Sequence, residues 1–165
     1  MSHYQRIACL STEAVETLYA LGAQDVIAGI SGFTVRPARA REEKTRISGF
    51  SSSNLERILA VEPDLVIGFC DMQADICRDL VKAGIEVHQF NQRTVDGILR
   101  MIAVLAALVQ REDAGRELIA SLRTDIAAAR TRAAAWTRKP VMYFEEWNDP
   151  LMSGIGWAAE LIAIA

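Results

Sequence analysis

The stretch SGFSSSNLERILAVEPDLVIGFCD, residues Ser48–Asp71, decides the fold. Ser53 and Glu56 have the spacing of a capping box, in which two side chains satisfy backbone N–H groups at a helix start. Pro63 ends the predicted helix, because the residue before a proline avoids the helical conformation. Leu65–Phe69 is apolar at every position, which is typical of a strand in a parallel sheet with helices on both faces.

The first 110 residues repeat this alternation of strand and helix. Further predicted strands are Arg6–Leu10, Val26–Ile30 and Ile85–Phe90. Further predicted helices run from Ser11 or Thr12 to Tyr19, from Gln73 to Ala83, and from Thr94 to about Gln110. The polar segment Ser31–Ser48 is interpreted as one long loop. Alternating elements with short links predict an α/β fold with a parallel, Rossmann-like sheet.

The pattern changes after residue 110. Glu112–Ala135 predicts one long helix of roughly 36 Å at 1.5 Å per residue. Val141–Glu145 predicts a strand, Glu146–Gly156 a polar turn, and Trp157–Ala165 an apolar helix. One strand and one helix cannot make a sheet, so we interpret them as the opening of a second lobe. The expected divisions are an N-terminal α/β lobe (1–110), a connecting helix (111–138) and the first βα unit of an incomplete C-terminal lobe (139–165).

Composition narrows the functional classes. Eighteen basic and 21 acidic residues give a net charge of −3, which argues against a nucleic-acid partner. The longest apolar run, Met101–Val109, is too short to span a bilayer, so we expect no membrane-spanning segment. The first ten residues do not resemble a signal peptide, which leaves a cytoplasmic location open. The three cysteines lack the spacing of a disulfide framework, so we expect free thiols at Cys9, Cys70 and Cys77.

Motifs for catalysis and metal binding are missing from the sequence. It has no Gly-x-Ser-x-Gly elbow and no glycine-rich phosphate loop, so we do not expect an enzyme and keep a Rossmann-type enzyme as the last alternative. The two histidines, His3 and His88, do not support a histidine-rich metal site. Glu145, Glu146 and Asp149 have a spacing that suits an oxygen-ligand site, but a charged turn is the simpler interpretation. We therefore predict no metal.

Several segments resemble one family over essentially the whole chain. They are Asn54–Ile58 with Glu62–Ile67, Leu10–Glu13, Ala83–Val87, and the long helix followed by Val141–Glu145. The chain resembles the helical-backbone (class III) substrate-binding proteins of ABC importers for vitamin B12, haem and ferric siderophores, and within that group the cobalamin-binding branch. The resemblance implies two α/β lobes joined by one long helix. It also implies no covalently bound cofactor, a ligand such as cobalamin, haem or a ferric siderophore held between the lobes, and delivery to a permease.

Ligands of parallel sheets bind beyond the carboxyl ends of the strands, which makes the loop after Leu65–Phe69 a candidate site. A flat macrocycle needs apolar contact area and a few orienting polar groups. The resemblance implies aromatic ligand contacts at Phe33, Phe50 and Phe69, for which core packing is the alternative. Trp147 lies in a polar turn and has no evident core role. The expected ligand-binding residues are Ser11, Thr12, Glu13, Phe33, Phe50, Phe69, Asp71 and Trp147.

Charged residues suggest two further roles. The resemblance implies that Glu56 docks onto arginines of the permease, and the alternative is that it only caps its helix. The matching glutamate that the resemblance implies for a second lobe is absent from these 165 residues. Arg36, Arg39, Arg41 and Arg46 are able to bind ligand carboxylates. Acidic residues interleave with these arginines, so a solvated loop is the favoured interpretation.

The leading hypothesis is the substrate-binding component of an ABC importer. The resemblance implies a periplasmic or membrane-associated extracytoplasmic location. The alternative is a cytosolic ligand-binding protein of the same fold that is not linked to transport. If the protein ends at Ala165, we expect a homodimer through the incomplete C-terminal lobe, because Trp157, Leu161 and Ile162 would need covering.

Overall fold

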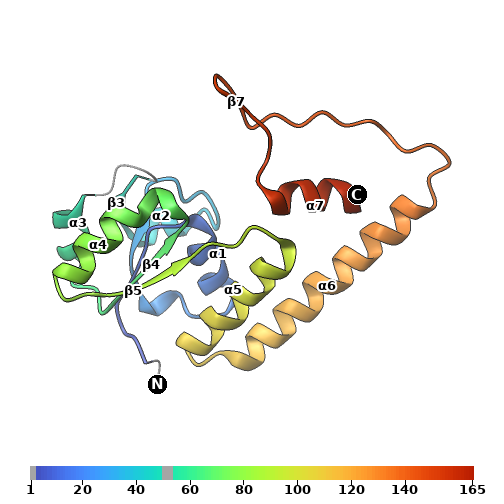
Figure 1. Cartoon of the computed structure of the whole chain (residues 1–165). Coiled ribbons are helices and arrows are strands. Elements are labelled where there is room, and N and C mark those ends of the chain that lie inside the picture. The colour runs from blue at the N-terminus through green and yellow to red at the C-terminus, as the bar shows by residue number, and fades with distance from the viewer. Residues whose placement is uncertain (1–2, 50–53) are drawn as a thin grey trace.

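The computed structural model describes residues 3–49 and 54–165, and its centre is a five-stranded parallel sheet (Figure 1). The strands are β1 (Ile7–Cys9), β2 (Ile27–Ser31), β3 (Thr45–Ser48), β4 (Leu65–Phe69) and β5 (Glu86–Phe90). Their order in the sheet is β3-β2-β1-β4-β5. The chain therefore builds outward from β1 on one side and then crosses to β4 on the other. Such a reversal leaves a crevice beyond the carboxyl ends of β1 and β4, where open α/β sheets bind ligands. The predicted α/β fold is confirmed.

Helices cover both faces of this sheet. The N-terminal helices are α1 (Thr12–Ala20), α2 (Ala40–Glu43), α3 (Leu55–Leu59), α4 (Ala74–Lys82) and α5 (Val95–Leu108). Side chains alternate between the faces along a strand. Ile7 and Cys9 of β1 accordingly pack in the core with α1 and α5, whereas Ala8 and the following Leu10 pack in the core with α3 and α4.

Local signals placed most of these elements correctly. The strand predicted at Leu65–Phe69 is β4, and all five of its residues are buried. Gly22 (φ 67°) and Gly84 (φ 82°) follow α1 and α4 in the left-handed conformation that favours glycine, as the predicted helix ends require. The Thr94 hydroxyl caps α5 by accepting a hydrogen bond from the Gly97 N–H at 3.0 Å.

The predicted start of α3 was wrong by one residue. The N-cap is Asn54, whose Oδ1 accepts a hydrogen bond from the Arg57 N–H at 3.1 Å. Ser53, which the capping-box prediction chose, lies outside the described residues. Asparagine is as good an N-cap as serine, so the polar residue next to Leu55 takes the position.

The prediction of one long loop at Ser31–Ser48 was also wrong. The segment contains helix α2 and strand β3. β3 lies at the edge of the sheet and only Ile47 is fully buried, so the strand lacks the apolar run that marks a central strand.

This segment is fastened to α1 by polar contacts. The Tyr19 hydroxyl donates a hydrogen bond to Glu43 at 2.8 Å, and the Arg39 guanidinium lies 4.9 Å from the centre of the Tyr19 ring. Burial, reinforced by the Glu43 carboxylate, raises the pKa of Tyr19 to about 12. Arg36 forms an ion pair with Glu16 at 3.4 Å. Two of the four arginines predicted to be solvated therefore contact their own chain.

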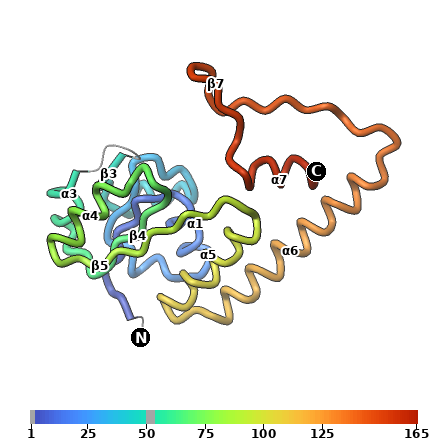
Figure 2. Tube along the Cα trace, viewed as in Figure 1, coloured from blue at the N-terminus to red at the C-terminus, as the bar shows by residue number. Residues whose placement is uncertain are grey.

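The second part of the chain begins with α6 (Glu112–Ala134), which runs away from the sheet (Figure 2). The chain then returns through a two-stranded hairpin, β6 (Trp147–Asn148) and β7 (Leu151–Met152), to α7 (Gly156–Ile164). α7 packs against α5 and α6. Within the described part of the chain, no helix combines the length and apolar character that crossing a membrane requires.

The strand predicted at Val141–Glu145 does not form. These residues are exposed, and the Val141 side chain is fully so. A strand needs a hydrogen-bonding neighbour, and the described residues place none beside this segment. The hairpin forms instead inside the predicted turn Glu146–Gly156.

Candidate functional site

The crevice between β1 and β4 is spanned by the side chain of Gln73, which is 1% exposed. Its Oε1 accepts a hydrogen bond from the Phe69 N–H at 2.9 Å, and its Nε2 donates one to the Leu10 carbonyl at 3.2 Å. One side chain therefore joins the carboxyl ends of the two strands at which the strand order reverses. Gln73 is not among the predicted site residues, although it lies in the loop after β4 that was predicted as a candidate site.

The loop after β4 has an unusual backbone. Cys70 has a φ of 64°, which is uncommon for a residue other than glycine. The side-chain amide of Gln89 on β5 donates a hydrogen bond to the Cys70 carbonyl. A Cβ at Gly68 would overlap the Gln89 side chain, so glycine allows this close approach. The crevice thus has an ordered edge on the β4–β5 side.

A cavity of about 430 Å³ lies between α1, α5, α6 and the start of α7. Its polar lining includes Thr12 and Glu13, both predicted site residues, together with Glu16 and Gln92. Apolar residues of α5 and α6 make most of the remaining wall, and Trp157 of α7 contributes an aromatic ring. The structure therefore brings two of the predicted residues together with the second part of the chain.

Gln92 is the least expected member of this cavity. It is 8% exposed, and its Nε2 donates a hydrogen bond to the Met101 sulfur at 3.3 Å. Its Oε1 is buried without a partner among the described residues. Because nearly all buried polar atoms are paired, this oxygen is a candidate acceptor for a ligand or water. Gln92 follows β5 at the carboxyl edge, so the rule that selected Asp71 would also have found it.

The side chains of two predicted ligand-binding residues have structural roles and are buried. Ser11 is 2% exposed, and its hydroxyl caps α1 by accepting a hydrogen bond from the Ala14 N–H at 3.3 Å. Phe69 is 8% exposed at the end of β4. These positions leave little surface of either side chain for a ligand.

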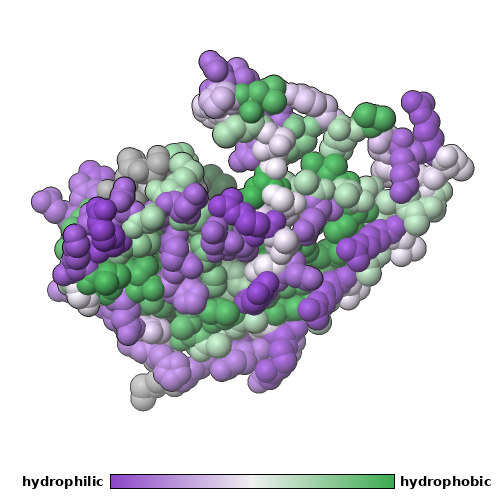
Figure 3. Space-filling model, in the orientation of Figure 1, coloured by the Kyte–Doolittle hydropathy of each residue, from purple (hydrophilic) through white to green (hydrophobic). Residues whose placement is uncertain are grey.

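The other aromatic candidates are open to solvent. Phe33 follows β2 and is 63% exposed, and Trp147 on the hairpin is 59% exposed. The Trp147 indole N–H donates a hydrogen bond to the Asp149 carbonyl at 2.9 Å. In Figure 3, apolar surface gathers on the hairpin and along the border of α6 and α7. Phe50 lies outside the described residues.

Asp71 links the carboxyl ends of β4 and β5. Its carboxylate, which is largely exposed, forms an ion pair with Arg93 at 3.5 Å. Asp71 lies two residues after β4 and Arg93 three residues after β5, at the edge where ligands of such sheets bind. The pair therefore places one negative and one positive charge beside the crevice.

No cluster in the described part of the chain has three or more side chains suited to hold a metal ion. His88 lies in β5 with its ring centre 4.2 Å from that of Phe90, and burial lowers its pKa. Glu145, Glu146 and Asp149 lie in exposed backbone around the hairpin.

Glu56 is exposed in the first turn of α3. Its carboxylate makes no hydrogen bond or ion pair with another described residue. Among the described residues nothing occupies this side chain, while Ser53, its partner in the capping alternative, lies outside them.

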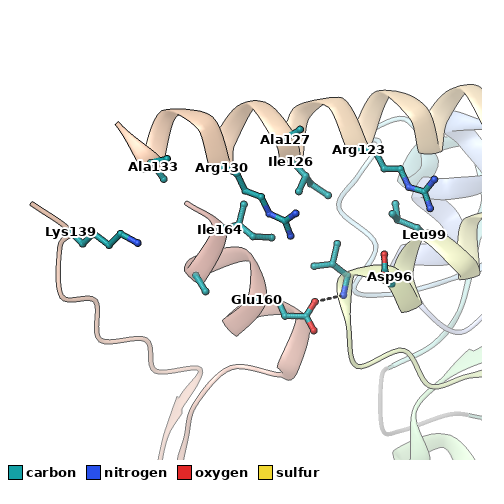
Figure 4. Close-up of a pocket in the computed structure, with 13 residues that line it drawn as sticks. Asp96, Leu99, Arg123, Ile126, Ala127, Arg130, Ala133, Lys139, Glu160 and Ile164 are labelled. Atoms are coloured by element: carbon teal, nitrogen blue, oxygen red, sulfur yellow. Dashed lines mark hydrogen bonds between the residues drawn. The ribbon is translucent and has the colours of Figure 1, made fainter. Parts of the chain in front are cut away.

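A larger cavity, about 750 Å³, lies between α5, α6 and α7 (Figure 4). Basic residues line it from α6 and the following segment, namely Arg123, Arg130 and Lys139. Asp96 and Glu160 line it from α5 and α7. It contains none of the predicted site residues, so the smaller cavity remains the candidate ligand site.

Comparison with known proteins identifies the family. The sequence profile described as "Periplasmic binding protein" matches residues 7–165. The chain belongs to this family. The resemblance found in the sequence is thereby confirmed, and so is the predicted class III fold.

Individual relatives agree with this assignment. The vitamin B12-binding protein of Vibrio campbellii is 27% identical over 161 residues, covering 95% of this chain and 58% of the relative. The cobalamin-binding protein of Halobacterium salinarum is 30% identical over 131 residues, covering 77% of this chain and 35% of the relative. The matched regions thus span 58% of the first relative and 35% of the second.

Solved structures share the fold. The periplasmic vitamin B12-binding protein of Vibrio cholerae superposes with a TM-score of 0.77 at 24% identity, covering 91% of this chain and 58% of that one. A periplasmic haem-binding protein from Roseiflexus gives a TM-score of 0.71 at 24% identity, covering 82% and 52%.

Proposed function

We propose that this chain forms the first lobe and connector of a periplasmic binding protein that captures a corrinoid for an ABC importer. In this proposal residues 1–110 are the N-terminal lobe, 111–138 the connecting helix and 139–165 the first βα unit of the second lobe. The observation that carries it is the cavity between α1, α5, α6 and the start of α7, which combines Thr12, Glu13 and Gln92 with Trp157. Relatives named for vitamin B12 and cobalamin support the ligand class.

The exposed aromatic residues support a large, flat ligand. Phe33 and Trp147 each leave more than half of their surface in water, which is costly unless a partner covers it. A corrin ring would stack on such side chains. We expect Phe33 from the first lobe and Trp147 from the hairpin to contact the macrocycle, with Thr12, Glu13 and Asp71 as polar contacts.

Two arginines near the crevice are held in ion pairs, which favours an amide-rich corrinoid over an anionic ligand, whereas Arg46 and Arg57, which line a pocket with Gly32 and Ser48, are in no ion pair among the described residues. Arg36 is paired with Glu16 and Arg93 with Asp71. Haem propionates or siderophore carboxylates would need arginines free to make bidentate contacts. Corrinoid carboxamides instead require acceptors and donors, and Gln92 Oε1 offers an acceptor. Haem or a ferric siderophore is the alternative ligand.

Delivery would use Glu56. Its exposed position and open carboxylate suit an ion pair with a permease arginine. Because the chain belongs to the periplasmic binding protein family, we also propose an extracytoplasmic location for the protein. Exchanging Glu56 for Gln removes the charge and keeps the size. We expect Glu56→Gln to weaken association with a reconstituted permease while ligand binding stays unchanged.

The ligand proposal is tested by titrating cyanocobalamin against variants and following tryptophan fluorescence. Phe33→Ala and Trp147→Ala should each weaken binding by roughly tenfold, which corresponds to about 1.4 kcal/mol of lost stacking. Val35→Ala is the matched control, because Val35 is 61% exposed on the same loop as Phe33. Equal affinity in all four proteins would contradict the proposed site. A cytosolic binding protein of the same fold would bind the ligand but show no effect of Glu56 on a permease.

A further inference from the structure

The start of α7 sits on the turn between β5 and α5. The Arg93 carbonyl oxygen lies so close to Gly156 that a Cβ at position 156 would overlap it. One helical turn further along α7, Glu160 Oε2 accepts a hydrogen bond from the Val95 N–H at 2.7 Å (Figure 4). Two contacts on the same side of α7 therefore join it to the first residues of α5.

The Glu160 contact satisfies a group that every helix start leaves open. The first N–H groups of a helix have no partner within it, and Val95 is the first residue of α5. Thr94 caps the Gly97 N–H, so the local cap leaves Val95 to another acceptor. A carboxylate is favoured at a helix N-terminus by the helix dipole and makes a strong, charge-assisted hydrogen bond.

The Glu160 carboxylate contacts the start of α5 although basic side chains lie near it. Arg123, Arg130 and Lys139 line the same cavity as Glu160. None of the ion pairs found in residues 3–49 and 54–165 includes Glu160, although three cations are near. The carboxylate points instead to the N-terminal end of α5, as Figure 4 shows.

The same turn also contacts the candidate ligand site. The Arg93 side chain pairs with Asp71 at the edge of the crevice, while its carbonyl faces Gly156. Gln92 lines the smaller cavity. The turn 92–95 therefore contacts the site on one side and α7 on the other.

We propose that Gly156 and Glu160 form a latch that fixes the orientation of α7 on the first lobe. Glu160 is a positioning residue that caps α5 from 65 positions further along the chain. Gly156 supplies the close approach that brings Glu160 within reach. The latch makes no contact with a ligand. Its role therefore does not depend on which ligand the protein binds.

Amide hydrogen exchange measured by NMR tests the latch. In Glu160→Ala, exchange at the Val95 amide should accelerate by about fivefold, the factor that corresponds to losing one helix cap. The Trp157 indole resonance should move, because α7 loses its fixed position. Glu160→Gln should show a smaller change, since its amide oxygen still accepts a hydrogen bond. Glu117→Ala, an exposed carboxylate on α6, is the matched control and should change neither signal.

Gly156→Ala tests the same proposal without touching the carboxylate. Its added Cβ would push α7 away from Arg93, so Val95 exchange should accelerate as in Glu160→Ala. Amides of β1 report whether either variant has lost the core as a whole. Unchanged Val95 exchange and an unmoved Trp157 resonance in both folded variants would overturn the latch. If Glu160→Ala fails to fold, Gly156→Ala and Glu160→Gln decide between these outcomes.

Discussion

Single side chains hold the ends of the strands where the candidate site lies. Gln73 is the clearest case, because it pairs with the Phe69 N–H and the Leu10 carbonyl at once. Gln73→Met keeps the volume but leaves both backbone groups buried without this partner. We expect the free energy of unfolding to fall by roughly 2–6 kcal/mol, at about 1–3 kcal/mol for each of the two unsatisfied groups. Urea denaturation measures this free energy of unfolding. The control is Gln24→Ala, because the Gln24 side chain makes no hydrogen bond with a described residue.

Tyr19 gives the protein a specific dependence on alkaline pH. Burial and the hydrogen bond to Glu43 raise its pKa from 10.0 to about 12. The folded state therefore holds the phenol proton more tightly than the unfolded state. This contribution to stability is fully present below about pH 10 and is lost as the pH rises toward about 12. Over that pH interval, the free energy of unfolding should fall less in Tyr19→Phe than in the parent protein. Parallel falls in chemical denaturation experiments would contradict the assignment.

At the scale of elements, helix starts depend on their caps. Asn54 caps α3, the helix that presents Glu56. Asn54→Ala should lower the free energy of unfolding by about 1 kcal/mol, the usual cost of losing an N-cap. Thr124→Ala, in an exposed part of α6, is the control. A loss no greater than in that control, measured by urea denaturation, would show that Asn54 does not hold the helix start.

Sequence patterns identified the elements that have strong local signals. β4 is apolar at every position, α5 begins at a threonine cap, and α6 is a long run without proline. The edge strand β3 was not predicted, because Ile47 is its only buried residue. The strand expected at Val141–Glu145 failed because strand formation depends on a neighbour, which no local pattern reveals.

The candidate site was only partly predictable for a similar reason. Thr12 and Glu13 were found from the rule that ligands bind beyond strand ends. Gln73 matters through a contact across 63 positions of sequence, and Trp157 through a cavity formed by several helices. Such contacts leave no periodic signal in the chain.

At the scale of the whole molecule, the second part of the chain leaves much apolar surface in water. Val141, Met142, Tyr143 and Leu151 are each more than 60% exposed. Exposed surface of this kind promotes association. Residues 1–165, expressed alone, should therefore self-associate in sedimentation velocity experiments. Replacing Met142 and Leu151 by Glu should shift the distribution toward monomer, and a monomer in the parent protein would contradict this expectation.

The central claim is that the cavity lined by Thr12, Glu13, Gln92 and Trp157 is one wall of a corrinoid-binding site. Isothermal titration calorimetry of the protein with both lobes tests it most directly, with cyanocobalamin, haem and a ferric siderophore as separate titrants. We predict saturable heat with one site for cyanocobalamin and little or none for haem and the siderophore. Saturable heat from haem or the siderophore without any from cyanocobalamin, or no heat from all three, would contradict the claim.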